Sequence, residues 1–153
     1  MTSQRPVFRD LSRAEAEAIL ARNHVGRLAF LGEDHQVDIT PIHYVFADGM
    51  VHGRTAAGTK LSAVAHRPWV AFETDEAEAA FRWRSVVVRG TIFRLDAEHT
   101  PKEYAGTLEL IRRMVPSALT TADPTPERDI LFRIDLGEIT GRAADDGTPS
   151  EAP

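Results

Sequence analysis

The stretch DITPIHYVFADGMVHGRTAAGTKL, residues 38–61, carries the local signals that decide the fold. Asp48-Gly49 lies between two β-rich runs, and this dipeptide is a strong signal for a two-residue hairpin turn. We therefore predict one strand over residues 36–46 and a second strand that ends at Arg54. A polar loop follows, and it opens a short helix with Lys60 in its first turn. The stretch predicts a hairpin that leads into a helix start.

The start of this helix has the chemistry of a phosphate site. Backbone N–H groups, the positive end of the helix dipole and a cationic side chain together favour a dianionic phosphate. Thr55 and Thr59 supply hydroxyl groups, and Lys60 supplies the charge. Arg54, at the end of the strand, would add a planar donor with two prongs. The alternative interpretation is that both threonines only cap the helix and that both cations are ordinary surface charges.

Two capping boxes predict the other helices. Ser12 and Glu15 have the capping-box spacing, which places a helix after a flexible N-terminal stretch at residues 1–10. Thr100-Pro101-Lys102-Glu103 repeats the pattern with proline at the first helical position, so a second helix is expected to run to about Met114.

The remaining segments favour a small β protein of one domain, residues 11–142. Further strands are predicted at residues 27–31, 69–74, 81–95 and 130–136. The acidic segment 75–80 is predicted to be a solvated loop, and the polar tail 143–153 to be disordered. Short antiparallel strands with only a few helices indicate a mainly β, α+β fold closed into a barrel, because closure removes exposed sheet edges.

Composition excludes several classes of function. The chain of 153 residues has no cysteine, so disulfides, thiolate catalysis and cysteine metal sites are absent. A formal charge of −5 argues against broad contact with nucleic acid or anionic membrane. No apolar run approaches the ~20 residues of a membrane span, and the polar N-terminus lacks a signal-peptide core, so a cytoplasmic location is expected.

Other catalytic and metal-binding patterns do not match the sequence. It lacks the Gly-x-Ser-x-Gly elbow, the Gly-x-Gly-x-x-Gly fingerprint and the Gly-x-x-x-x-Gly-Lys-Ser/Thr phosphate loop. His43 and His52 fall on facing strands of the predicted hairpin, but no helical histidine pair or carboxylate pair completes a metal site. We therefore expect no catalytic metal, and we assign no catalytic residue.

The order of motifs resembles the FMN-binding split barrels related to pyridoxamine 5′-phosphate oxidase, especially the branch of nitroimidazole-resistance reductases. The resemblance covers residues 11–142. The segments that carry it are Gly26-Arg27-Leu28-Ala29, Thr40-Pro41-Ile42-His43-Tyr44, Arg54-Thr55-Ala56-Ala57-Gly58-Thr59-Lys60-Leu61, Arg67-Pro68-Trp69-Val70, Trp83-Arg84-Ser85-Val86-Val87-Val88-Arg89-Gly90 and Ile139-Thr140-Gly141-Arg142.

The resemblance implies an FMN site with its ring along the first strand of the hairpin and its phosphate at the helix start. The cofactor-binding residues that it implies are Thr40, Pro41, Ile42, Tyr44, Arg54, Thr55, Thr59, Lys60, Leu61, Trp83 and Ser85. Tyr44 and Trp83 could instead be core aromatics. Trp83 and Ser85 could reach the cofactor from a partner chain, because the family forms homodimers with each flavin groove at the dimer boundary.

The resemblance also sets the expected activity. We expect an FMN-dependent oxidoreductase that passes a hydride or electrons from a reduced donor to a small electron-poor acceptor, with the cofactor supplying the chemistry. The alternatives are a reductase with a deazaflavin in the same groove, or a non-catalytic binder of flavin or haem. For haem, which is the less favoured ligand, His43 or His52 would be the candidate axial residue. The oxidase itself is less favoured, because the segment after Arg142 is acidic and lacks the basic residues of that enzyme's substrate site.

Overall fold

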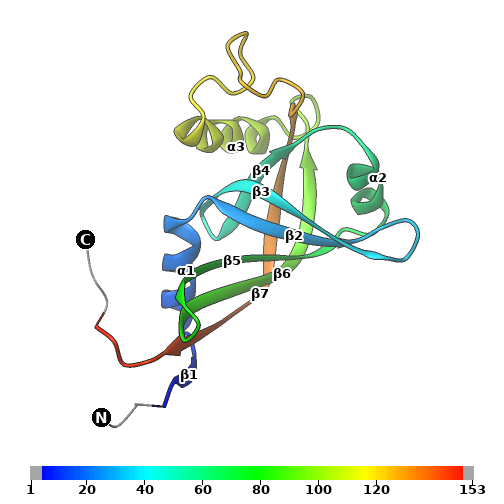
Figure 1. Ribbon diagram of the computed structural model, residues 1–153. Helices are drawn as coiled ribbons and strands as arrows, with labels where there is room; N and C mark the ends of the chain where they lie inside the picture. Colours follow the sequence, from blue (N-terminus) through cyan, green and yellow to red (C-terminus); the bar gives the residue numbers. More distant parts are fainter. Residues whose placement is uncertain (1–4, 150–153) are drawn as a thin grey trace.

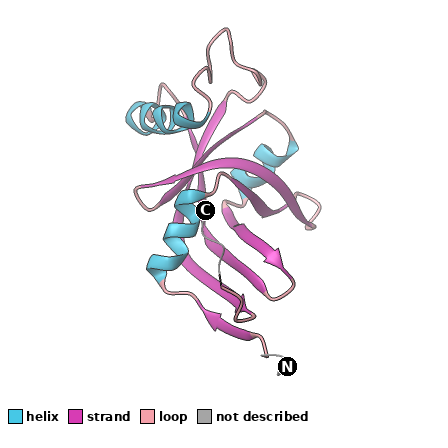
Figure 2. Ribbon diagram, turned by 60° about the vertical axis from the view of Figure 1, so that its left-hand side comes forward, coloured by secondary structure: helices cyan, strands magenta, loops and turns pink. Residues whose placement is uncertain are grey.

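The fold is an antiparallel β-barrel with three helices outside it. The computed structural model describes residues 5–149, apart from the side chains of residues 59–61. The elements are β1 (Val7–Asp10), α1 (Arg13–Arg22), β2 (Val25–Leu31), β3 (Val37–Ala47), β4 (Met50–Thr55), α2 (Thr59–His66), β5 (Trp69–Ala79), β6 (Arg82–Leu95), α3 (Pro101–Met114) and β7 (Ile130–Asp145). Figure 2 shows the helices at separate places around the sheet. The predicted mainly β split barrel with flanking helices is confirmed.

The last long strand closes the barrel. The sheet order is β1-β7-β4-β3-β2-β5-β6, and β7 also pairs with β6, which closes the six strands from β2 to β7 into a ring with β1 attached to β7 (Figure 1). The β6–β7 ladder slips by one residue at Gly90, where an added Cβ would lie 2.0 Å from the carbonyl oxygen of Asp135. Only glycine fits so close an approach of two backbones. Gly90 therefore allows β6 to bend around the barrel.

Aromatic and aliphatic side chains fill the barrel, and α1 closes one side of it. Tyr44 and Phe72 are both 0% exposed, and their rings meet edge to face at 4.8 Å. Ala16, Ile19 and Leu20 on one side of α1 are buried against this core. The predicted capping box of α1 is confirmed, because Ser12 Oγ accepts from the N–H of Glu15 and the Glu15 carboxylate accepts from the N–H of Ser12.

The predicted hairpin between β3 and β4 is also confirmed. Ala47 pairs with Met50 across a two-residue turn. Asp48 and Gly49 have φ angles of 54° and 73°, the left-handed region that this turn type requires.

The acidic segment is the main error of the sequence prediction. Residues 75–79 were expected in a loop, but β5 continues through them and pairs with β6 almost to its tip. Glu76 forms an ion pair with Arg22 on α1, and Asp75 lies 3.3 Å from Arg27 on β2. The carboxylates are balanced by arginines on neighbouring elements, which the density of acidic residues along the sequence cannot reveal.

The ends of the sheet extend beyond the predicted domain limits. Val7–Asp10, inside the stretch expected to be flexible, forms β1 and pairs with residues 142–145 of β7. Ala143 and Ala144, placed in the predicted tail, are buried. Residues 1–4 and 150–153, which belong to the same two predictions, lie outside the described residues.

The helix predicted from the second capping box runs from Pro101 to Met114, but the box itself does not form. Thr100 makes no side-chain cap to α3. Its hydroxyl instead accepts from the N–H of Asp96 at 2.7 Å and donates to the Asp96 carbonyl at 3.0 Å.

In the described part of the chain, no helix is long and apolar enough to cross a membrane.

Candidate functional site

Strand β4 divides the candidate residues between its two faces. Val51 is buried in the barrel core, and the next residue but one, Gly53, lies so close to the Phe132 ring that an added Cβ would be 2.5 Å from it. Thr55 continues this inward row. His52 and Arg54 lie on the other face, where they contact α3 and the loop after it. Alternation along the strand therefore sends the adjacent residues Arg54 and Thr55 to opposite sides.

Strands β3 and β4 separate just before the candidate flavin-binding segment. In the described residues, their backbone pairing extends from the turn to Tyr44↔Gly53 and stops there. Residues 37–43 of β3 pair only with β2, and Arg54 and Thr55 pair only with β7. The separation leaves one backbone edge of β3 unpaired at Thr40, Pro41 and Ile42. Unpaired edge groups need another hydrogen-bonding partner, which a ligand can supply.

Helix α2 begins where the two strands separate, and it follows β4 after a short loop, as predicted from the sequence. Its first residue is Thr59, and the loop before it joins the end of β4 to the helix. The side chains of Thr59, Lys60 and Leu61 lie outside the described residues, so their predicted ligand roles stay predictions. Thr55 is described and is 8% exposed, with a hydrogen bond of 3.5 Å to the Ala56 carbonyl. That long bond leaves its buried hydroxyl only weakly satisfied.

Two hollows flank α2. One, of about 270 Å³, lies under the helix and includes Thr55, Gly58 and Ser62 in its lining. The other, of about 540 Å³, lies between α2 and the β2–β3 turn and is lined by Thr40, Ala63 and three carboxylate residues, which are Glu33, Asp34 and Asp38. Ser62 donates to Glu33 at 2.7 Å across this second hollow. Thr40 and Ala63, in the middle of α2, therefore border one hollow, and Thr55 and Gly58, before the helix, border the other.

Arg54 is fully engaged by the loop that follows α3. Its guanidinium donates to both carboxylate oxygens of Asp123, at 2.6 and 3.1 Å, and to Thr125 Oγ1 at 2.8 Å. Side-chain exposure is 8% for Arg54 and 1% for Asp123. Asp123 also accepts from the N–H groups of Leu119 and Thr125. The Arg54 hydrogen bonds are the largest cause of a strongly lowered pKa for Asp123. Arg54, which was predicted to bind a phosphate, is thus paired with the carboxylate of Asp123.

His52 forms a second buried polar contact on the same face of β4. Its Nδ1 lies 2.7 Å from the Thr107 hydroxyl on α3, and its Nε2 lies 3.3 Å from the Ala47 carbonyl. A carbonyl only accepts, so the neutral ring carries its proton on Nε2 and Nδ1 accepts from Thr107. Burial lowers the pKa of His52 and favours this neutral form.

Two other predicted contacts lie away from α2. The Tyr44 hydroxyl donates to the Leu20 carbonyl at 2.7 Å, and burial raises the pKa of Tyr44 to about 12. Tyr44 is therefore a core aromatic in this chain, the alternative that the sequence left open. Trp83 lies nine residues before Ile92 on β6, a separation of about 30 Å along a strand. Ser85, near Trp83, donates to Glu73 at 3.0 Å.

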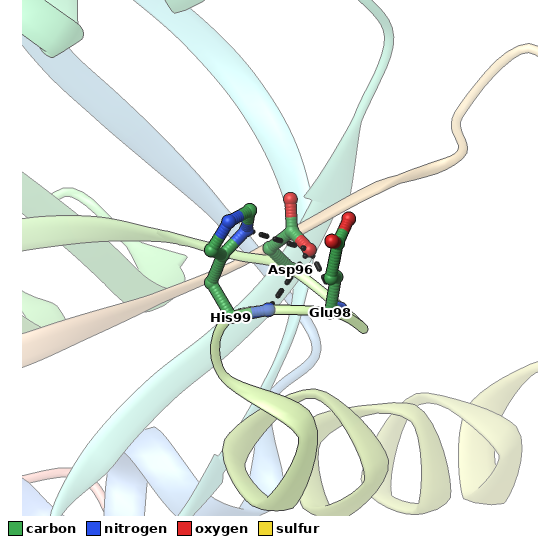
Figure 3. Close-up of side chains that lie close together, drawn as sticks. All are labelled: Asp96, Glu98 and His99. Atoms are coloured by element: carbon green, nitrogen blue, oxygen red, sulfur yellow. Dashed lines mark hydrogen bonds and ion pairs between the residues drawn. The ribbon is translucent and has the colours of Figure 1, made fainter.

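Three side chains with metal-ligand atoms cluster in the β6–α3 loop (Figure 3). The possible ligand atoms of Asp96, Glu98 and His99 lie within 4.8 Å of one another. Asp96 Oδ1, however, already accepts from the backbone N–H groups of Glu98 and His99, at 2.7 and 3.2 Å. This pattern is an Asx turn that shapes the approach to α3. The geometry is accounted for by the turn alone.

Neither Asp123 nor Arg94 is among the residues predicted from the sequence. Asp123 lies in a proline-containing loop far along the chain from Arg54, and only the fold brings the two together. Arg94 looks like an ordinary polar residue near a strand end, yet it lines the hollow under α2. The alternation of β6 was a usable signal for Arg94, because it shares the parity of the apolar interior residues.

The comparisons with known proteins agree with this architecture. The family model described as pyridoxamine 5′-phosphate oxidase matches residues 12–143. The chain therefore belongs to this family. No curated protein matches its sequence.

Solved structures share the fold over nearly the whole chain. A FAD-binding protein of Mesorhizobium loti superposes with a TM-score of 0.75 at 24% identity, covering 91% of this chain and 99% of the other. A candidate 5-nitroimidazole antibiotic resistance protein of Bacteroides thetaiotaomicron gives a TM-score of 0.74 at 12% identity, with 92% and 90% coverage. A FAD-binding protein of Mycobacterium smegmatis gives a TM-score of 0.59 at 26% identity, with 89% and 97% coverage.

Proposed function

We propose that the protein is a homodimeric oxidoreductase that binds FMN and passes a hydride or electrons from a reduced donor to a small electron-poor acceptor. The observation that carries this proposal is the separation of β3 from β4 beside the start of α2. It leaves an unpaired strand edge for a planar ring and, next to it, a helix start for a phosphate. The flavin, when bound, supplies the redox chemistry.

The chain's own groups have defined tasks in this proposal. The backbone edge at Thr40 to Ile42 would bind and orient the polar edge of the ring. Thr55, with its weakly satisfied hydroxyl, and the first N–H groups of α2 would bind the phosphate. Lys60 would add charge at the same end. Ile42, which is 5% exposed, would keep this part of β3 fixed on the core.

The relatives support a flavin as the ligand. Two of the structural neighbours are described as FAD-binding proteins, and the family is that of a pyridoxamine 5′-phosphate oxidase. FMN and FAD share the ring and the first phosphate, so both use the strand edge and the helix start. We favour FMN because the helix start offers one compact phosphate site.

An exposed apolar face supports the homodimer. Val37, Ile39 and Trp69 are 77%, 70% and 73% exposed. Ala29 pairs with Ile39 on one side and with Ala71 on the other, which makes the face continuous across β3, β2 and β5. Contiguous exposed apolar surface marks a contact site. A second copy would cover it, and in such a dimer Trp83 and Ser85 of one copy would reach the groove of the other.

Spectroscopy of the purified protein tests the cofactor. We expect FMN to be bound as isolated or on titration, with a dissociation constant in the micromolar range or below, and mass analysis of the released molecule identifies it. No spectral or calorimetric change with FMN, FAD, a deazaflavin or haem would refute the proposal. Oxidation of reduced nicotinamide or reduced deazaflavin in the presence of an acceptor separates a reductase from a non-catalytic binder.

Light scattering tests the assembly. We expect twice the 16.9 kDa mass of one chain, and we expect Trp69→Arg to give a monomer because it places a charge in the apolar face. Arg128→Gln, an exposed change outside this face, is the control. A wild-type monomer that still binds FMN would remove the homodimer from the proposal.

A further inference from the structure

The hollow under α2 is a chamber at one end of the barrel. Its walls come from four strands, β2, β4, β6 and β7, and its roof is α2 with the residue before it. The lining residues are Leu28, Thr55, Gly58, Ser62, Val64, Ala65, Ile92, Arg94 and Phe132. Its volume of about 270 Å³ corresponds to roughly nine water molecules at liquid density.

The floor of the chamber is apolar. Leu28, Phe132 and Ile92 are 1%, 2% and 9% exposed, so they belong to the barrel core and are held in place by it. Chambers with apolar walls retain water poorly and bind apolar groups instead. The floor therefore favours a ligand with a hydrocarbon body.

Among the described side chains that line the chamber, Arg94 is the one cation, and it lies at the mouth. Interior-facing residues of β6 are buried at Val86, Val88 and Ile92, and Arg94 continues the same row at the end of the barrel. Arg94 is paired in register with Phe132, directly beside the floor. Within the described residues its guanidinium has no hydrogen bond or ion pair, whereas Arg54 on β4 is fully engaged by Asp123. No carboxylate is among the described lining residues, so the chamber favours a ligand with negative charge.

We propose that this chamber binds a small amphipathic carboxylate. The hydrocarbon body would pack between Leu28, Ile92 and Phe132, and the carboxylate would pair with Arg94. A monoanion fits better than a phosphate dianion, because the apolar walls cannot repay the desolvation of two charges.

The site goes beyond the proposed flavin function. The chamber shares Thr55 and Gly58 with the proposed phosphate site, but its apolar floor and Arg94 lie inside the barrel end, and Thr40 and Ile42 of the proposed flavin edge do not line it. The carboxylate is therefore expected to bind both with and without FMN. A failure of the protein to bind flavin would leave this inference standing.

Calorimetric titration with benzoate and with benzyl alcohol tests the site. The two probes share the ring and differ in charge. We expect benzoate to bind one site per chain and benzyl alcohol to bind about tenfold more weakly, since a hydrogen bond to a charged group is worth about that factor. Equal affinities, or no binding of benzoate at millimolar concentration, would overturn the proposal.

Variants assign the binding to the chamber. Arg94→Gln should weaken benzoate about tenfold and leave benzyl alcohol unchanged, whereas Arg84→Gln, in the same row at the other end of β6, should change neither. Ala65→Phe fills the chamber from the exposed side of α2 and should abolish binding of both probes, with the melting temperature reporting that the fold is intact. Retained binding in Ala65→Phe, or displacement of benzoate by FMN, would overturn the proposal.

Discussion

Helices α3 and α2 are attached to the barrel in opposite ways, although both lie beside β4. On the α3 side, buried polar pairs connect the barrel to the helix and its loop: His52 to Thr107, and Arg54 to Asp123. On the α2 side, Thr55 faces a chamber of about 270 Å³, and the one side-chain hydrogen bond that α2 makes in the described residues joins Ser62 to Glu33 at the surface.

The two attachments separate polar groups that stabilise the fold from polar groups that remain available for a ligand. A buried, fully paired arginine fixes a loop but has no capacity left for a ligand. A weakly satisfied hydroxyl beside a helix start is less stabilising and can accept a new partner. Neighbouring residues of one strand thus serve stability on one face and binding on the other.

Removal of Asp123, which leaves Arg54 without its partner, should have the largest effect, a loss of stability. Asp123→Ala leaves the guanidinium 8% exposed and without its carboxylate, and unpaired buried charges are among the most costly defects. We expect the melting temperature to fall by on the order of 10 °C. Thermal unfolding followed by circular dichroism measures this. A fall of less than about 2 °C would show that the pair contributes little to stability.

Removal of the Lys60 charge at the start of α2 should have the next largest effect. It should weaken the binding of FMN and leave the stability unchanged. Lys60→Ala should weaken FMN by roughly 10- to 150-fold, because hydrogen bonds to charged groups are worth about 1.5–3 kcal/mol. Riboflavin, which has the same ring and no phosphate, should be unaffected. Fluorescence quenching gives both dissociation constants for both proteins. Equal losses for the two ligands would exclude Lys60 from the phosphate site.

The His52 contact predicts a pH-dependent stability on the α3 side. Burial lowers the pKa of His52, so between that value and the unfolded value of 6.5 the unfolded chain binds more protons than the folded chain. Stability should therefore fall as the pH drops below about 6.5, by up to about 1.4 kcal/mol per pH unit. Urea unfolding at pH 8, 6 and 5 measures this slope for wild type and for His52→Leu, in which it should be smaller.

A surface histidine provides the control for that measurement. His99→Gln, at an exposed position, should leave the slope unchanged. Glu15 and Glu76, whose pKa values are lowered to about 2 by Arg9 and Arg22, lose their ion pairs only at more acidic pH. A slope that is the same in wild type and His52→Leu would contradict the assignment to His52.

The sequence predicted most of the local structure because its signals are local. Asp48-Gly49 fixed the hairpin, and Ser12 with Glu15 fixed the start of α1. The prediction of a loop at the acidic end of β5 was wrong because the stabilising partners of this segment, Arg22 and Arg27, lie on other elements. The capping box at Thr100 failed because its hydroxyl bonds the turn at Asp96 instead.

The candidate site was predictable in position but not in detail. The order of strand, turn, strand, loop and helix placed Thr40 to Ile42 and the start of α2 near one another. The partner of Arg54 could not be predicted, because Asp123 is distant in sequence and its loop has no distinctive pattern. The chamber under α2 depends on the closure of the barrel and on how α2 lies across its end.

The smallest expected effect is on flavin binding when the Arg54 pair is replaced as a unit. Arg54→Met combined with Asp123→Leu removes both charges and keeps apolar bulk, a change that is often tolerated for buried ion pairs. Because Arg54 faces the loop after α3 and Thr55 faces α2, the double variant should bind FMN within about twofold of wild type. The same titration that measures Lys60→Ala measures it. A loss of tenfold or more for FMN, with riboflavin unchanged, would mean that Arg54 leaves Asp123 to bind the phosphate, and the division of β4 into a structural face and a binding face would then be wrong.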